Sequence, residues 1–207
     1  MGEWGGKKLE KVETYLAQLR DVLAQSSFTT TNGYLDLSTT DNPVEREELL
    51  SSVPPGDILM SFQEIMMAEI AKCNSDKIKI GINELLKHLL ATIDKDREHY
   101  LAERYLYRVR MVFKRCLLPD FPYAEEVWNY ICDCLRSTGT FLVEGDYYIA
   151  AREVINSLAG MGRIAALKGL PTANTQSSLR IMENMALKKK EQQLASIAKN
   201  ARFNLET

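Results

Sequence analysis

The scarcity of helix-breaking residues constrains the fold of this chain more than any other feature. Between Gly56 and Pro119 the sequence holds no proline and a single glycine, Gly81. Proline and glycine disfavour helix interiors, so this stretch favours long helices. One helix of more than about 40 residues would be unusual. We therefore expect a break at 94–96, where charged residues replace the apolar period.

The rest of the chain follows the same pattern and predicts an all-α protein of about eight helices. Short stops separate them at Pro119–Pro122, Ser137–Thr140 and Gly169–Pro171. After a short helix that follows Asn42-Pro43, the helices are expected over 58–72, from 77 to the break, from the break to Pro119, and over 123–136, 146–168, 175–188 and 190–204. Their packing is expected to be an irregular bundle or a short α-solenoid.

The N-terminal part divides into two segments before a helical domain at 43–207. Residues 1–25 are expected to form an amphipathic helix, because Leu9, Val12, Leu16, Leu19 and Leu23 step by three and four. This seam either joins two copies in a homodimer or lies on the body of one copy. Residues 26–42 are rich in Ser and Thr, and form either a loop or a small β-hairpin at 28–37 around Asn32-Gly33.

Three C-terminal segments have similar sequences, at 161–168, 182–189 and 194–201. Each combines apolar residues with an Ile-Ala or Met-Ala pair and then basic or small residues. Ala165 and Ala198 lie 33 residues apart, which is close to the length of a helix-hairpin repeat. From about residue 146 the chain resembles HEAT and armadillo helical repeats. The resemblance implies paired helices that pack closely through small residues.

The net charge of −2 conceals an uneven distribution of charge. Residues 1–99 hold 11 basic and 17 acidic side chains (net −6), and residues 152–207 hold nine and four (net +5). The basic end includes Lys188, Lys189 and Lys190. Such an end suits an acidic partner, nucleic acid or head-to-tail self-association, or is simply a solvated basic face.

One stripe of arginines is more specific. Arg97, Arg104, Arg108 and Arg115 fall on one face of a helix, beside its apolar face. Guanidinium groups so placed bind carboxylates of a neighbouring helix or an anionic ligand. The pair Glu125-Glu126 is the expected internal partner.

The sequence offers little evidence for catalysis or for a bound cofactor or metal. No nucleotide-binding, P-loop or nucleophile-elbow motif occurs in the sequence, so we expect no cofactor and favour a non-catalytic protein. A weaker alternative is a metal site, since Glu84, His88, His99 and Glu103 would share a face if their helix were continuous.

No apolar run is long enough to span a membrane, and the pattern of a signal peptide is absent from the N-terminal residues. The four cysteines are expected to be reduced and the protein cytoplasmic.

The sequence therefore supports three hypotheses about function. The first is a helical protein-interaction or scaffold module, binding another protein through the C-terminal helix pairs or the arginine stripe. The second is a nucleic-acid-associated regulatory protein that uses the basic C-terminal helices. The third is a helical metal protein or enzyme.

Overall fold

The computed structural model describes residues 55–205, which contain seven α-helices and no strand. The helices are α3 (Pro55–Ala71), α4 (Ser75–Thr92), α5 (Glu98–Cys116), α6 (Ala124–Glu144), α7 (Tyr148–Leu167), α8 (Ala173–Lys188) and α9 (Gln192–Phe203). The all-α prediction is confirmed. The predicted N-terminal helix with its leucine seam, the loop or hairpin at 26–42 and the helix after Asn42-Pro43 lie outside the described residues.

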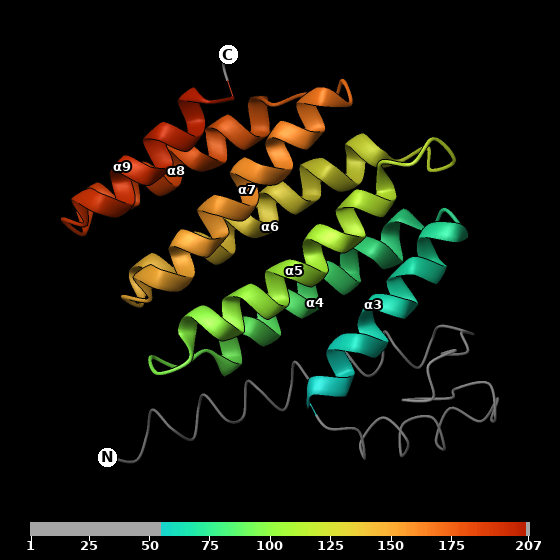
Figure 1. Ribbon diagram of the computed structural model, residues 1–207, viewed down its shortest axis with the longest axis horizontal. Coiled ribbons are helices and arrows are strands. Elements are labelled where there is room, and N and C mark those ends of the chain that lie inside the picture. Colours follow the sequence, from blue (N-terminus) through green and yellow to red (C-terminus); the bar gives the residue numbers. More distant parts are fainter. Residues whose placement is uncertain (1–54, 206–207) are drawn as a thin grey trace.

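The helices stack in two layers. Each helix packs against the second helix after it, so α3, α5, α7 and α9 form one layer and α4, α6 and α8 the other. Figure 1 shows α5, α7 and α9 side by side in front of the fainter α4, α6 and α8. This stacking is that of a short α-solenoid, one of the two predicted architectures.

The core lies between these layers. Phe113 of α5 and Trp128 of α6 are fully buried, with ring centroids 4.6 Å apart. Such an aromatic pair contributes about 0.5–1.5 kcal/mol beyond the burial of its apolar area. The two rings therefore join the layers near the middle of the chain.

The largest error in the predicted boundaries concerns α6. The sequence predicts a stop at Ser137–Thr140, but the helix continues through this segment to Glu144. The hydroxyl groups of Ser137 and Thr140 donate hydrogen bonds to carbonyl oxygens of their own helix. Gly139 is buried, and a Cβ there would lie 2.3 Å from Cε of Met182 on α8. The glycine thus permits a close crossing with α8 and does not end the helix.

Four of the links between helices are the same tight turn. Cys73, Asp146, Gly169 and Lys190 each have a positive φ, between 54° and 75°. The residue after each donates its backbone N–H to the carbonyl five residues earlier, at 2.8–2.9 Å. This is the Schellman motif, in which a left-handed residue ends the helix. The predicted break at 94–96 and the predicted turns at Pro119–Pro122 and Gly169–Pro171 also separate helices in the structure.

The sequence-similar segments lie on three successive helices, α7, α8 and α9. Ala165, Ala186 and Ala198 are all fully buried. However, Ala165 lies near the end of α7, whereas Ala198 lies in the middle of α9. The stacked helices α4, α6 and α8 begin 49 residues apart. The 33-residue step therefore does not match the spacing of the stacked helices.

The left-handed turn at Lys190 yields a test of this fold. Replacing Lys190 with glycine should raise the free energy of unfolding by about 0.5–1 kcal/mol, because a side chain in this conformation is strained. Lys188→Gly, within the last turn of α8, should instead lower it, because glycine is a poor helix former. Urea titration followed by circular dichroism measures both changes. Destabilisation by Lys190→Gly would contradict the described turn.

Candidate functional site

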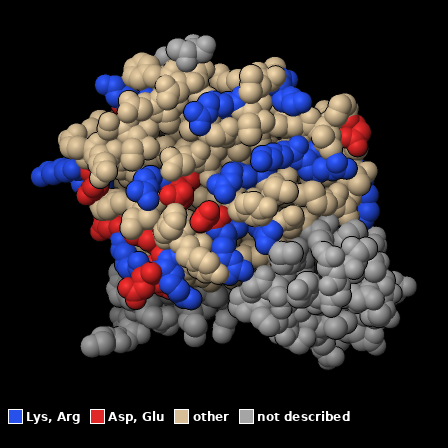
Figure 2. Space-filling view, in the orientation of Figure 1, with Lys and Arg blue, Asp and Glu red and all other residues tan. Residues whose placement is uncertain are grey.

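The helices of the two layers differ in net charge. Helices α5, α7 and α9 together carry nine basic and three acidic side chains (net +6), whereas α3, at the end of the same layer, carries three acidic and no basic ones. Helices α4, α6 and α8 carry six basic and seven acidic ones (net −1). Figure 2 views the basic layer and shows Lys and Arg spread across it, with fewer Asp and Glu. The asymmetry seen along the sequence thus also becomes a difference between two faces.

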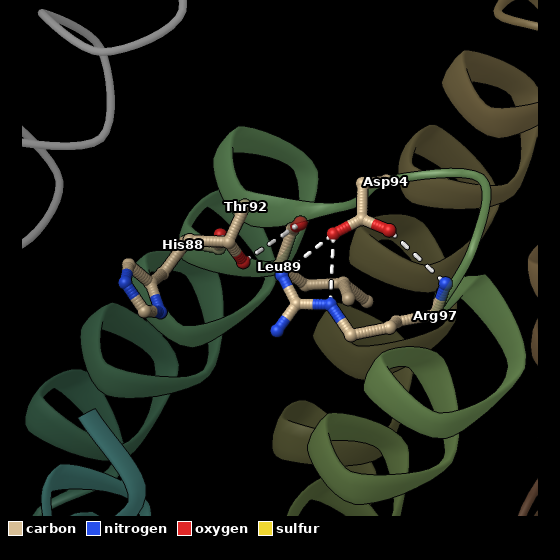
Figure 3. A network of polar contacts seen from close by, with 5 residues as sticks. All are labelled: His88, Leu89, Thr92, Asp94 and Arg97. Atoms are coloured by element: carbon tan, nitrogen blue, oxygen red, sulfur yellow. Dashed lines mark hydrogen bonds and ion pairs between the residues drawn. The ribbon is translucent and has the colours of Figure 1, made fainter.

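Arg97 does not belong to the predicted stripe. It is the N-cap residue of α5, and its guanidinium pairs with Asp94 at 2.6 Å (Figure 3). Its backbone N–H also donates to the same carboxylate, at 3.0 Å. Hydrogen bonds from Arg97 lower the pKa of Asp94. This pair closes the link between α4 and α5.

The remaining arginines lie along the outward side of α5 beside two tyrosines. Arg104 stacks on Tyr100, with 5.3 Å from its guanidinium carbon to the ring centroid, and donates to the Tyr100 hydroxyl at 3.2 Å. Arg108 lies at the same distance from Tyr107 and donates a hydrogen bond to Gln63 of α3. Arg115 is exposed in the last turn. We call Tyr100, Arg104, Tyr107, Arg108 and Arg115 the α5 ridge.

The predicted internal partner of these arginines is engaged elsewhere. Glu126 lies on α6, in the other layer, where Lys79 pairs with it at 2.5 Å and the Ser75 hydroxyl donates to it at 3.4 Å. Hydrogen bonds to Asp76 and then Glu126 raise the pKa of Lys79. The predicted pairing of the stripe with Glu125-Glu126 is therefore wrong, because the two helices present these groups on opposite faces.

The three C-terminal lysines have different roles. Lys189 donates to the backbone carbonyl of Glu144 at 2.8 Å and pairs with Asp146 at 2.9 Å, so it caps the end of α6. Lys190 occupies the left-handed position of the turn after α8. Lys188 is exposed at the end of α8. Two of the three predicted binding residues thus contribute to helix ends.

The structure does not bring the predicted metal ligands together. The break after Thr92 places His88 and His99 on different helices. His88 is buried, while the exposed His99 lies 3.9 Å from Glu103 and 3.6 Å from Glu153. Glu84 accepts hydrogen bonds from Lys87 and Asn83. In residues 55–205, no group of three or more His, Cys, Asp or Glu side chains has the arrangement of a metal site.

Burial suppresses the reactivity of three thiols. It raises the pKa of Cys116 and Cys132 to about 12 and that of Cys134 to about 11. A thiol is nucleophilic only as its thiolate, so these cysteines are poor nucleophiles at neutral pH. All four cysteines of the chain are free, and none forms a disulfide.

A groove between α4 and α6 was missed by the sequence analysis. Its volume is about 370 Å³, and it lies on the layer opposite the α5 ridge. Leu86, Leu90 and Phe141 supply apolar walls, and Lys87 and Asp133 supply charge. Phe141 is 49% exposed although it lies on a largely buried helix. The sequence offers no signal for the groove, because the relative placement of the two helices creates it.

Comparisons with protein-family models, with curated proteins and with solved structures found no significant match. The resemblance to HEAT and armadillo repeats therefore stays a prediction. Within residues 55–205, none of the helices is both long and apolar enough to span a membrane.

A buried histidine links α4 to α5. His88 is 2% exposed, and its Nδ1 lies 2.5 Å from the hydroxyl oxygen of Tyr105, which is 4% exposed. The backbone carbonyl of His88 accepts a hydrogen bond from the Thr92 hydroxyl at 2.8 Å (Figure 3). Burial lowers the pKa of His88 from 6.5 to about 4. This histidine is therefore neutral in the folded protein at neutral pH.

The neutral histidine makes stability depend on pH. Between about pH 6.5 and 4 the unfolded chain binds a proton at residue 88 that the folded state excludes. This contribution is fully present above pH 6.5 and is lost as the pH falls, by up to about 3 kcal/mol in total. Urea denaturation at several pH values should show a smaller decline for His88→Gln than for the wild type. Equal declines would show that His88 ionises freely in the folded state.

Proposed function

We propose that this protein is a non-catalytic interaction module whose α5 ridge binds an acidic segment of another protein. One observation carries the proposal. Among the carboxylates whose side chains the structure describes, none forms an ion pair with Arg104 or Arg115. Two arginines on the basic layer thus offer hydrogen-bond donors that a partner's carboxylates can accept.

The geometry of the ridge favours carboxylates as ligands. A guanidinium group donates two parallel hydrogen bonds to one carboxylate, and such charged bonds are about twice as strong as neutral ones. The tyrosine beside Arg104 holds its side chain along the helix, which reduces the entropy lost on binding. Tyr100 and Tyr107 are 55% and 45% exposed and add apolar contact area. Tyrosine and arginine together are typical of binding hot spots.

Two further observations favour binding over catalysis. The three buried thiols are poor nucleophiles, and the buried His88 is held by Tyr105, away from any solvent-facing substrate. General acid–base catalysis needs a group that reaches the substrate. The exposed His99 faces Glu103 and Glu153 on the open surface between α5 and α7. We expect the protein to act in the cytoplasm, where its cysteines stay reduced.

Nucleic acid is the second candidate ligand. The basic layer could neutralise phosphates, and exposed tyrosine rings could stack on unpaired bases. The wider charge of +6 over α5, α7 and α9 favours this alternative. The ion pair of Lys189 with Asp146 leaves that lysine less available to phosphate than the exposed Lys188 and Lys190.

Charge reversal on the ridge tests the proposal. The full chain should bind a fluorescein-labelled, glutamate-rich peptide in fluorescence anisotropy at low salt. The double variant Arg104→Glu/Arg115→Glu should weaken this binding at least about tenfold, because it replaces attraction with repulsion. The double variant Arg163→Glu/Arg180→Glu is the matched control: it makes the same change in charge at exposed positions on α7 and α8. It should bind at nearly the wild-type level.

The controls separate the two ligands. Circular dichroism should show equal helicity for all variants. If the ridge and control variants weaken binding equally, the effect is one of total charge and the ridge is not the site. A single-stranded oligonucleotide that binds the wild type while the peptide does not, with an affinity that falls steeply with salt, would favour the nucleic-acid alternative.

A further inference from the structure

The outward side of α6 is acidic where the α5 ridge is basic. Glu125, Glu126, Asp133 and Glu144 are partly or fully exposed on α6, and Arg136, the helix's single basic residue, pairs with Asp133 at 3.0 Å. Glu144 lies at the end of the helix, and among the described residues its carboxylate has no ion-pair partner. Because α6 and α5 belong to opposite layers, one molecule presents both faces but cannot join them to each other.

The charges on the two helices have the same spacing. Arg104 and Arg115 are 11 residues apart on α5, and Asp133 and Glu144 are 11 residues apart on α6. At 1.5 Å per residue, each pair spans about 16 Å. Two helices lying side by side could therefore place both arginines against both carboxylates, with Asp133 exchanging its partly exposed ion pair with Arg136 for one with an arginine of the other copy.

Apolar side chains lie between the charges in both cases. On α5, Tyr107 and Met111 lie between the two arginines, and Tyr107 is 45% exposed. On α6, Phe141 lies between the two carboxylates and forms part of the groove with Leu86 and Leu90 of α4. A groove of about 370 Å³ is large enough to receive an aromatic side chain. The α5 ridge and the outward side of α6 thus carry opposite charges at equal spacing, each with apolar side chains between the charges.

We propose that the acidic partner of the α5 ridge is a second copy of this chain, which presents its α6 edge and the α4–α6 groove. The inference rests on the proposed function, since it uses the same ridge. The interface is heterologous, because the ridge and the groove are different surfaces on opposite layers. Contacts of this kind leave a free ridge at one end and a free groove at the other, so copies add head to tail.

Sedimentation velocity of the full chain tests the assembly. At low salt the mean mass of the wild type should rise with concentration, and added salt should reduce it because charge pairs are screened. Arg104→Glu reverses one charge on the ridge, and Glu144→Arg reverses one charge on the acidic edge. Each variant alone should raise the apparent dissociation constant at least about tenfold. Asp120→Arg, an exposed change in the link between α5 and α6, is the matched control for Glu144→Arg and should assemble like the wild type.

Mixing the two variants tests whether the ridge and the acidic edge meet each other. The Glu144→Arg protein keeps its ridge and the Arg104→Glu protein keeps its groove, so an equimolar mixture should regain association that neither variant shows alone. The mass of the wild type distinguishes the kind of contact, because a symmetric interface stops at a dimer whereas head-to-tail contacts let the mass keep rising with concentration. A wild type that stays monomeric up to the highest soluble concentration would overturn the inference, as would assembly that neither variant alters.

The same variants separate this inference from the proposed function. Glu144→Arg leaves the ridge intact and should still bind the glutamate-rich peptide. If the peptide binds and the chain does not assemble, the self-association is wrong and the ridge remains a site for another acidic protein. If neither binding nor assembly is detected, both are wrong.

Discussion

The close crossing of α6 with α8 at Gly139 is the contact on which the stacked arrangement depends. A Cβ at this position would overlap Met182 of α8 and lie 3.2 Å from Val154 of α7. The same device joins α3 to α4, where Gly81 meets Met66 and Phe62. The absence of a side chain lets neighbouring helices approach, and the flexible methionines fill the space that remains. The approach at Gly139 joins two helices of one layer, and the approach at Gly81 joins a helix of one layer to a helix of the other.

The layered arrangement explains how a nearly neutral protein presents two different faces. Alternate helices belong to opposite layers, so the basic side chains of α5, α7 and α9 gather on one side. The acidic residues of α6 face the other side, where Lys79 pairs with Glu126 and Arg136 pairs with Asp133, and where Glu125 and Glu144 keep their charges exposed. The core separates these basic and acidic side chains, so the two groups cannot pair with each other within one molecule. The charges are therefore available to other molecules, which is why the proposals concern binding.

Local structure was largely predictable from the sequence, and each prediction that was wrong has a physical reason. The break near Asp94 was predicted from charge, and it lies where Asp94 binds the N-cap residue of α5. The stop at Ser137–Thr140 was wrong because hydroxyl groups can bond within the helix and because Gly139 serves packing. Three of the four arginines predicted to share a face of one helix lie on α5, whereas Arg97 precedes that helix. Its expected partner was wrong because the sequence does not reveal which layer a helix joins.

The sequence by itself determined that this protein is helical, where most of its helices end, and which side of α5 carries arginines. Those properties depend on neighbours within a few turns, so periodicity and helix-breaking residues reveal them. The tertiary structure alone decided that Glu126 meets Lys79, that Lys189 caps α6 and that a groove lies beside Phe141. Each of these brings together side chains more than 40 residues apart. Such contacts depend on how helices stack, and no local pattern encodes that arrangement.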